Sequence, residues 1–326
     1  MPLLLLGVVT IVFVVSRTAA ADPIASLVPE RLLGNEEVVQ AARARWGLDR
    51  SSPEQYGLYL KNLVQGDMGT SFRTKQPVAS DITERLPATV ELTIAALAIA
   101  AIVGIPAGVA AAVKRDTWID HLVRLFSLIG SSLPVFWTGL ILLFVFFTRL
   151  GVAPGPGRID LRALPPDRIT GLYTVDAFLD GNVSLGLDAM HHLMLPAFVL
   201  GWAVMGIIAR MVRASMLDVL NQDYIRTARA KGLTNRQVIF THALRNALIP
   251  TVTILGISLA ALLTGAVLTE TIFSWPGLGS YAVESTRTLD LPAVMGVAIF
   301  GGATFVVANL VIDVSYGIID PRIRVS

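Results

Sequence analysis

Long apolar runs separated by polar stretches dominate this chain of 326 residues. About 20 apolar residues in a helix are needed to cross the hydrocarbon core of a bilayer. Six candidate runs cover residues 1–21, 89–113, 122–150, 193–212, 248–273 and 292–318. None of them has the alternating pattern of a membrane β-barrel strand. The sequence therefore predicts an all-α, polytopic membrane protein with six transmembrane helices.

The longest polar stretch, residues 22–88, follows the first run. It can cross a membrane whatever its charge, and we predict a small extracytoplasmic domain or loop here. Inside it, four apolar residues at helical spacing predict an amphipathic helix over 53–64. These four are Tyr56, Tyr59, Leu60 and Leu63. The remainder, residues 89–326, is predicted to form a five-helix core.

The first run, residues 1–21, allows two interpretations. Ala19, Ala20 and Ala21 resemble the cleavage site of a secretory signal peptide. A signal peptide also needs a basic region before its apolar part, and only Met1 and Pro2 precede this run. We therefore favour a retained first transmembrane helix.

The composition supports a membrane protein and excludes several chemistries. The chain is 54% hydrophobic and 15% charged, whereas soluble domains carry about 25% charged residues. The absence of cysteine excludes disulfides, thiolate metal sites and cysteine nucleophiles. The net charge of +2 is small and the basic residues cluster in loops, so nucleic acid is not an implied partner.

The distribution of Lys and Arg predicts the orientation in the membrane, because short cytoplasmic loops are enriched in both. Basic residues flank the turn after the second run, the loop after the fourth run and the C-terminal tail. They include Lys114, Arg115, Arg124, Arg210, Arg213, Arg322 and Arg324. Only Arg287 lies between the fifth and sixth runs. We expect both termini in the cytoplasm.

The loop after the fourth run contains the strongest candidate site, within a cytoplasmic docking loop predicted over 214–247. Residues 224–250 include five cationic side chains and no acidic one. Gly232 is expected to divide the stretch into two short helical pieces, since glycine disfavours a helix interior. The small side chains of Thr227, Ala228 and Ala230 would let a partner approach the backbone closely. The predicted docking residues are Arg226, Thr227, Ala228, Arg229, Ala230, Lys231 and Gly232.

This stretch resembles the cytoplasmic loop of ABC importer permeases, whose core is Glu-Ala-Ala, three residues and then Gly. The matching positions are Arg226-Thr227-Ala228 and Gly232, so the Glu is absent. The Ala-Arg-Ala-Lys-Gly and His-Ala-Leu-Arg-Asn-Ala sequences instead resemble the dipeptide/oligopeptide branch. The turn at 66–71, the Phe-Ser-Trp-Pro-Gly-Leu-Gly exit at 273–279 and the Asp-Pro-Arg tail extend the resemblance over nearly the whole chain.

The resemblance implies the type I importer fold and a permease subunit that moves di- or oligopeptides across the bacterial cytoplasmic membrane. Implied partners are a second homologous permease, one or two ATPases and an extracytoplasmic binding protein. The sequence has no phosphate-binding loop of its own, so the ATPase is expected on another chain. No cofactor, metal or catalytic residue is expected. Nickel, haem and oligosaccharide importers share this permease type, so the cargo stays open. Such permeases usually carry an Arg-rich lead, which suggests a short recorded start.

Three alternatives depend on individual residues. A secondary transporter would need ionisable groups in mid-membrane; Glu91, Glu270 and Asp313 are the candidates, and we expect interfacial structural roles for them. An intramembrane serine protease would use the stretch 130–133 with His192. A metal site at the adjacent His191 and His192 is disfavoured, because consecutive helical residues point in different directions.

Overall fold

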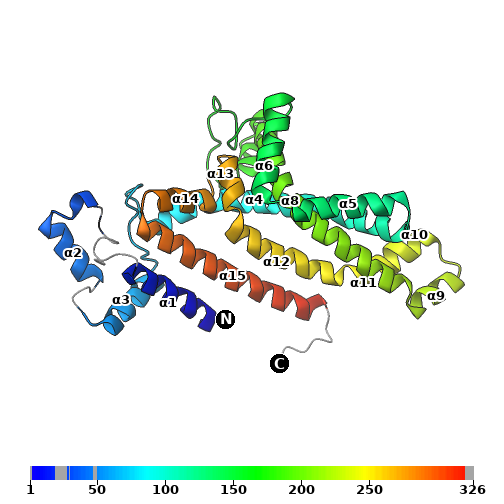
Figure 1. Cartoon of the computed structure of the whole chain (residues 1–326), viewed down its shortest axis with the longest axis horizontal. Helices are drawn as coiled ribbons and strands as arrows, with labels where there is room; N and C mark the ends of the chain where they lie inside the picture. Colours follow the sequence, from blue (N-terminus) through cyan, green and yellow to red (C-terminus); the bar gives the residue numbers. More distant parts are fainter. Residues whose placement is uncertain (1, 19–27, 29, 47–49, 320–326) are drawn as a thin grey trace. The chain divides into compact units, whose positions relative to one another are not determined.

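A computed structural model describes the chain except for residues 1, 19–27, 29, 47–49 and 320–326 (Figure 1). The described residues form helices, turns and one isolated bridge between Thr70 and Pro77. They divide into two compact units. Unit 1 comprises 1–89 and 276–307, and unit 2 comprises 90–275 and 308–326. The predicted all-helical class is confirmed, while the division into residues 1–21, 22–88 and 89–326 stays a prediction.

Three of the described helices are long and apolar enough to cross a membrane by themselves. They are α4 (Val78–Val113), α8 (Val183–Leu220) and the Leu291–Val311 part of α15 (Leu291–Ile319). Two bent helix pairs raise the number to five if each pair is one span, and Leu3–Ser16 is a shorter apolar helix. The six-span count is therefore carried forward as a proposal.

The third predicted span, residues 122–150, is broken at Pro134. The run is divided into α5 (Trp118–Ser132) and a second piece formed by α6 (Val135–Leu143) and the π-helix η3 (Phe144–Arg149). The two pieces meet at an angle of 104°. Leu133 has φ −79° and ψ 136°, because proline at position 134 disfavours a helical conformation of the residue before it.

Two other spans are longer than their apolar runs. Helix α4 begins at Val78 rather than at residue 89, and α8 extends beyond both ends of the predicted 193–212. Asn182 caps α8 by accepting a hydrogen bond from the Leu185 N–H. Hydropathy marks only the apolar part of a helix, whereas backbone hydrogen bonding continues into polar turns.

The fifth run is also interrupted. Helix α12 (Ile249–Gly265) ends before Ala266, which has φ −73° and ψ 10°. The short helix α13 (Val267–Ile272) follows. The basic tail with Arg322 and Arg324 and the candidate cleavage site at 19–21 lie outside the described residues, as does the side chain of Asp313.

Unit 1 has two small apolar clusters. Besides parts of α4 and α15, this unit contains α1 (Pro2–Thr18), η2 (Glu30–Leu32), α2 (Glu36–Trp46), α3 (Ser52–Val64) and α14 (Leu278–Arg287). The predicted amphipathic helix is confirmed as α3. Its four apolar residues pack with Val9, Phe13 and Ile299. Phe13 meets the Tyr56 ring edge-on at 5.2 Å.

Polar contacts connect the turn at 66–77 to α14 within unit 1. Asp290 accepts a hydrogen bond from the Ser71 hydroxyl at 2.5 Å. Asp81 accepts from the Tyr281 hydroxyl at 2.7 Å and from the Thr74 hydroxyl at 2.6 Å. Both carboxylates are buried, and hydrogen bonds offset part of the cost of removing them from water.

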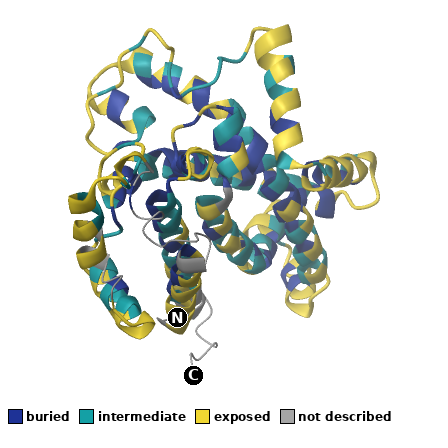
Figure 2. Ribbon diagram, turned by 60° about the vertical axis from the view of Figure 1, so that its left-hand side comes forward, coloured by how far each residue is buried: buried dark blue, intermediate teal, exposed yellow. Residues whose placement is uncertain are grey.

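Unit 2 is built on α4, α8 and α12. Gly108 lies so close to α8 that an added Cβ would be 2.6 Å from the carbonyl oxygen of Ala209. Gly108 in the second run thus permits close helix packing. Most helices have both buried and exposed faces (Figure 2).

Candidate functional site

The docking segment, residues 223–247, is a chain of short helices after α8 (Figure 1). Helix α9 (Asp223–Ala230) ends at Lys231, and Gly232 reverses the chain with φ +78°. Few residues other than glycine adopt such a φ without strain. Thr234 then caps α10 (Asn235–Gln237), which continues into the π-helix η4 (Val238–Ala243) and α11 (Leu244–Ala247). The predicted division at Gly232 is confirmed.

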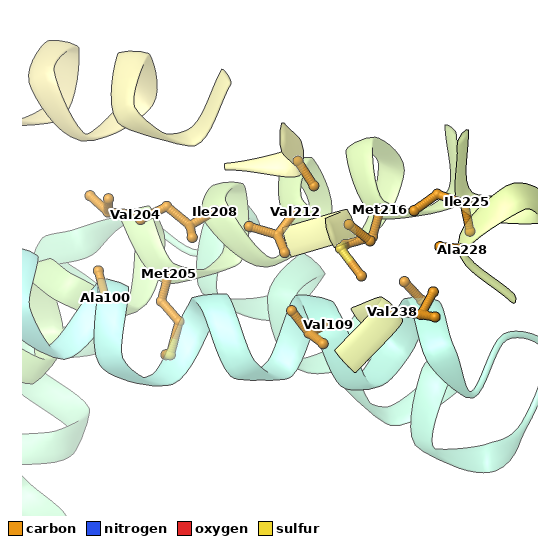
Figure 3. Packing of buried hydrophobic residues seen from close by; sticks show 13 residues of the cluster. Ala100, Val109, Val204, Met205, Ile208, Val212, Met216, Ile225, Ala228 and Val238 are labelled. Carbon is orange, nitrogen blue, oxygen red and sulfur yellow. The ribbon is translucent and has the colours of Figure 1, made fainter. Parts of the chain in front are cut away.

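Apolar side chains attach the docking segment to unit 2. Ile225 and Ala228 are buried on α9 and belong to the same cluster as Met216 of α8. Val238 and Ala243 of η4 join them. Figure 3 shows this cluster continuing along α8 and α4. The docking segment is therefore packed onto the helices it follows rather than hanging from them as a free loop.

Six of the seven predicted docking residues are exposed. They are Arg226, Thr227, Arg229, Ala230, Lys231 and Gly232. The seventh, Ala228, is only 7% exposed because its position on α9 faces Val238 and Met216 in the cluster. The role of Ala228 in a close fit to a partner stays a prediction, and within this chain the residue is buried. Its small side chain lets α9 lie close to the segment's own interior.

The exposed surface of the docking segment is strongly basic. Arg226 pairs with Asp223 at 3.3 Å, with side chains that are 74% and 94% exposed. Among the described residues, no carboxylate pairs with Arg229 or Lys231. Exposed pairs contribute about 0–1 kcal/mol. Arg229 and Lys231 therefore keep their charges facing solvent.

A hydrogen bond between the two ends of the docking segment was not foreseen. The Asn246 side-chain amide donates to the Tyr224 hydroxyl at 2.8 Å and joins α11 to α9. Both residues lie within the sequences that carried the family resemblance. The resemblance could have indicated their importance, but only the structure shows that they meet.

A buried charged network elsewhere in unit 2 was also missed by sequence reasoning. Arg158 donates to Glu91 at 2.5 Å and to the Gly171 carbonyl at 3.0 Å. Its guanidinium lies 3.5 Å from the centre of the Tyr173 ring. Glu91 also accepts from the N–H and hydroxyl of Thr174. Glu91 was expected near a helix end but lies inside α4, because that helix begins earlier than its apolar run.

The remaining candidates do not form a catalytic arrangement. The Ser131 hydroxyl donates to the Ser127 carbonyl at 3.0 Å, and His192 Nδ1 faces the Asp188 carbonyl at 2.9 Å. His191 Nε2 lies 3.1 Å from the Val152 carbonyl oxygen. Glu270 is fully buried. The structure thus does not bring Ser131 and His192 together as nucleophile and base.

The long apolar helices define the class of protein, an integral membrane protein. It carries an exposed basic surface on two short helical pieces joined at Gly232. The class can be narrowed to a family. A model of the binding-protein-dependent transport system inner membrane component family matches residues 104–325. The chain belongs to this family.

Individual relatives cover nearly the whole chain. A probable D,D-dipeptide transport system permease of Escherichia coli is 44% identical over 98% of this chain and 94% of its own length. A di/tripeptide transport system permease of Pseudomonas aeruginosa is 43% identical over 98% and 94%. An oligopeptide transport system permease of Bacillus subtilis is 39% identical over 98% and 95%. The resemblance to the dipeptide/oligopeptide permeases is confirmed.

Proposed function

We propose that this chain is the permease subunit of an ATP-driven importer of di- or oligopeptides, and that the docking segment receives the motion of a separate ATPase. The observation that carries the proposal is the two-sided nature of α9. Six predicted docking residues are exposed, while Ile225 and Ala228 on its other face are packed into the cluster with α8. A surface anchored in this way can transmit a displacement.

The proposed assembly contains further chains. A second homologous permease would complete the passage, one or two ATPases would bind the docking segments, and an extracytoplasmic binding protein would deliver the cargo. The chain itself would cross the cytoplasmic membrane six times with both termini inside. The basic residues near Lys114 and in the docking segment support this orientation through the positive-inside rule.

The proposed mechanism is mechanical. Closure of the ATPase pair on ATP would displace the docking segment, and the shared apolar cluster would carry that displacement to α8 and α4. Packed interiors transmit such strain because they are dense and compress little. The helices would then rock between inward and outward access without any covalent chemistry in this chain.

The proposed cargo is peptide because the relatives are named for peptides. Their names span D,D-dipeptides, di- and tripeptides, and oligopeptides, so peptide length is not part of the proposal. A binding protein that selects the cargo would explain a passage with few charged side chains.

The experiment that tests the proposal replaces Gly232 by Asp in the assembled importer. An added Cβ at Gly232 meets nothing within 4 Å in the chain, so a new side chain would project toward the partner. Asp and Asn both tolerate a positive φ better than other residues. We expect Gly232→Asp to abolish peptide uptake while ATP hydrolysis continues, and Gly232→Asn to weaken uptake less.

A matched control is Gly151→Asp, since Gly151 also has a positive φ (+62°) and an open surround. It should leave uptake per ATP unchanged. Normal uptake by the Gly232→Asp importer would refute the docking assignment. Uptake by this chain without any ATPase would favour a secondary transporter.

A further inference from the structure

Two arginines on successive turns of α8 hold α5. Arg213 donates from Nε and Nη2 to the two carboxylate oxygens of Asp120, each at 2.7 Å. Asp120 is fully buried and also accepts from the backbone N–H of Asp116 at 3.1 Å. Arg210 donates to the Ser127 carbonyl oxygen at 2.9 Å. We call the contacts of Asp120 and Ser127 with these two arginines the α5 clasp.

Helix α5 has no buried residue in the apolar cluster that joins α4, α8 and the docking segment. Its own buried residues are Asp120, Ser127 and Gly130, which are polar or small. Its large apolar side chains, such as Leu122 and Leu128, are exposed. The attachment of α5 to α8 therefore depends on the clasp, on close backbone approach and on the stacking of the Phe126 ring on Trp202, with centroids 5.0 Å apart.

The backbone approach is closest at Gly206 of α8, where an added Cβ would lie 2.5 Å from the Ser127 carbonyl oxygen. Trp202 adds a hydrogen bond from its indole N–H to the Phe126 carbonyl at 3.3 Å. These contacts allow the helices to be near each other but include no charged pair. Asp120 and Arg213 add a buried charged pair with two parallel charge-assisted hydrogen bonds, which fix the direction of α5 relative to α8.

The position of the clasp matters for transmission. The docking segment is packed onto α8 through Met216 and Ile225. A displacement of the segment would thus reach α8 through apolar packing. It would reach α5 through the close backbone approach and through the charged pair of Asp120 and Arg213. Helix α5 then continues through Pro134 into α6 at 104°, so a change in the direction of α5 would redirect α6.

We propose that Asp120 and Arg213 are positioning residues that make α5 follow α8 when the docking segment moves. The proposal rests on the proposed function. A buried ion pair is weak evidence of a contribution to stability, because apolar residues of similar volume often replace it without loss. Its rigid geometry suits a role in fixing the relative direction of two helices.

The test uses the complete importer in proteoliposomes with its binding protein, and measures peptide uptake and ATP hydrolysis together. We expect Asp120→Asn and Arg213→Gln each to lower the peptides taken up per ATP about tenfold or more, with hydrolysis nearly unchanged. The exchanged pair, Asp120→Arg with Arg213→Asp, should recover most of that ratio, as coupled residues do in double-mutant cycles. A ratio per ATP is insensitive to how much importer assembles.

The matched control is Arg115→Gln, which removes an exposed charge from the same turn. Arg115 pairs with Asp116 at 3.2 Å, with side chains that are 62% and 72% exposed. Its uptake per ATP should equal that of the unsubstituted importer. Two results would overturn the proposed role of Asp120 and Arg213. One is an unchanged uptake per ATP in both single variants. The other is an exchanged pair whose uptake per ATP is as low as that of the single variants. An unsubstituted importer without ATP-dependent uptake would instead overturn the proposed function.

A second measurement, the distance between spin labels on α5 and α8, tests the proposal even if the substituted importers assemble poorly. The chain has no cysteine, so Ile129→Cys on α5 and Ile207→Cys on α8 allow two spin labels at positions 38% and 41% exposed. An importer assembled with the unsubstituted chain measures how much spin label attaches to cysteines of the other subunits. The distance between labels should be the same with and without trapped ATP, and should change with ATP when Asp120→Asn is added. A distance that changes with ATP while Asp120 is present would overturn the proposal.

Discussion

The docking segment and the Arg158 segment, residues 157–180, are both polar parts of unit 2, but they are anchored in opposite ways. In the docking segment the charges face outward, and Ile225 and Ala228 are buried. In the Arg158 segment an ion pair is buried, with side chains of Arg158 and Glu91 that are 7% and 4% exposed. There Leu161 is 96% exposed.

The difference shows that a charge in the sequence has no fixed role. A charge on a helix with an apolar face points to solvent, because the apolar face takes the interior. The Arg158 segment has little helix and therefore no continuous apolar face. Its interior is filled by polar groups that form hydrogen bonds with one another. Asp176 does so by accepting hydrogen bonds from the N–H groups of Ile169, Thr170 and Gly171.

The largest expected effect comes from breaking the charged anchor. Arg158→Ala leaves Glu91 buried without its partner, which should cost about 3–5 kcal/mol of unfolding free energy. The purified chain in detergent should unfold at a clearly lower temperature, and trypsin should cleave after the exposed Arg162 much faster.

The control for this variant is Arg226→Ala in the docking segment, whose pair with Asp223 is exposed. Its effect on stability should stay below about 1 kcal/mol. Equal melting temperatures for the two variants would contradict the buried role of Arg158.

A smaller effect is expected from weakening the apolar anchor. Ile225 is fully buried, and Ile225→Ala should cost about 2–4 kcal/mol through lost contacts and a cavity. Because α9 would open locally, trypsin should cleave after Arg229 and Lys231 about tenfold faster or more, while cleavage after Arg162 stays unchanged.

The exposed neighbour Thr227→Ala is the control for Ile225→Ala, since Thr227 only donates to the Asp223 carbonyl at 3.1 Å. Its tryptic cleavage should match that of the unsubstituted chain. Faster cleavage in both segments of Ile225→Ala would mean that the two anchors are not independent.

The smallest expected effect is a pH dependence of stability that only the Arg158 segment should show. Burial raises the pKa of Asp176, but hydrogen bonds from Thr170, Gly171 and Ile169 outweigh burial, so this pKa lies below the ordinary 3.8. Ionised Asp176 therefore stabilises the fold above that value, and the contribution is lost as pH falls through the lower folded-state pKa.

Asp176→Asn should cost about 1–3 kcal/mol near neutral pH, because buried N–H groups lose an acceptor. The gap in melting temperature between this variant and the unsubstituted chain should narrow as the pH falls below 3.8. Ile225→Ala should show no such narrowing. A constant gap for Asp176→Asn would exclude the proposed role of its charge.

Local patterns predicted some features well. The spacing of Tyr56, Tyr59, Leu60 and Leu63 predicted α3, since helical periodicity directly encodes which face is buried. Gly232 predicted the break after α9, because glycine alone tolerates the positive φ of this turn at little cost. Six of the seven predicted docking residues are exposed, whereas Ala228 is buried by η4 residues farther along the chain.

Other features could not be read from the sequence. Proline at position 134 can interrupt a helix, but the 104° angle depends on what α5 and α6 pack against. Arg158 and Glu91 lie 67 positions apart, and no periodic pattern connects them. Asp120 and Arg213 lie 93 positions apart; Arg213 was used only to predict the orientation in the membrane, and Asp120 was not singled out.

The sequence by itself determined the helical membrane class, the family and the exposed basic surface of the docking segment. These depend on hydropathy, local conformational preference and short motifs, which neighbouring residues encode. Only the tertiary structure decided where each span bends, which charges are buried and which helices share an apolar core. Those properties arise from pairs of groups far apart in the chain, and a buried charge is stable only where folding brings its partner to it.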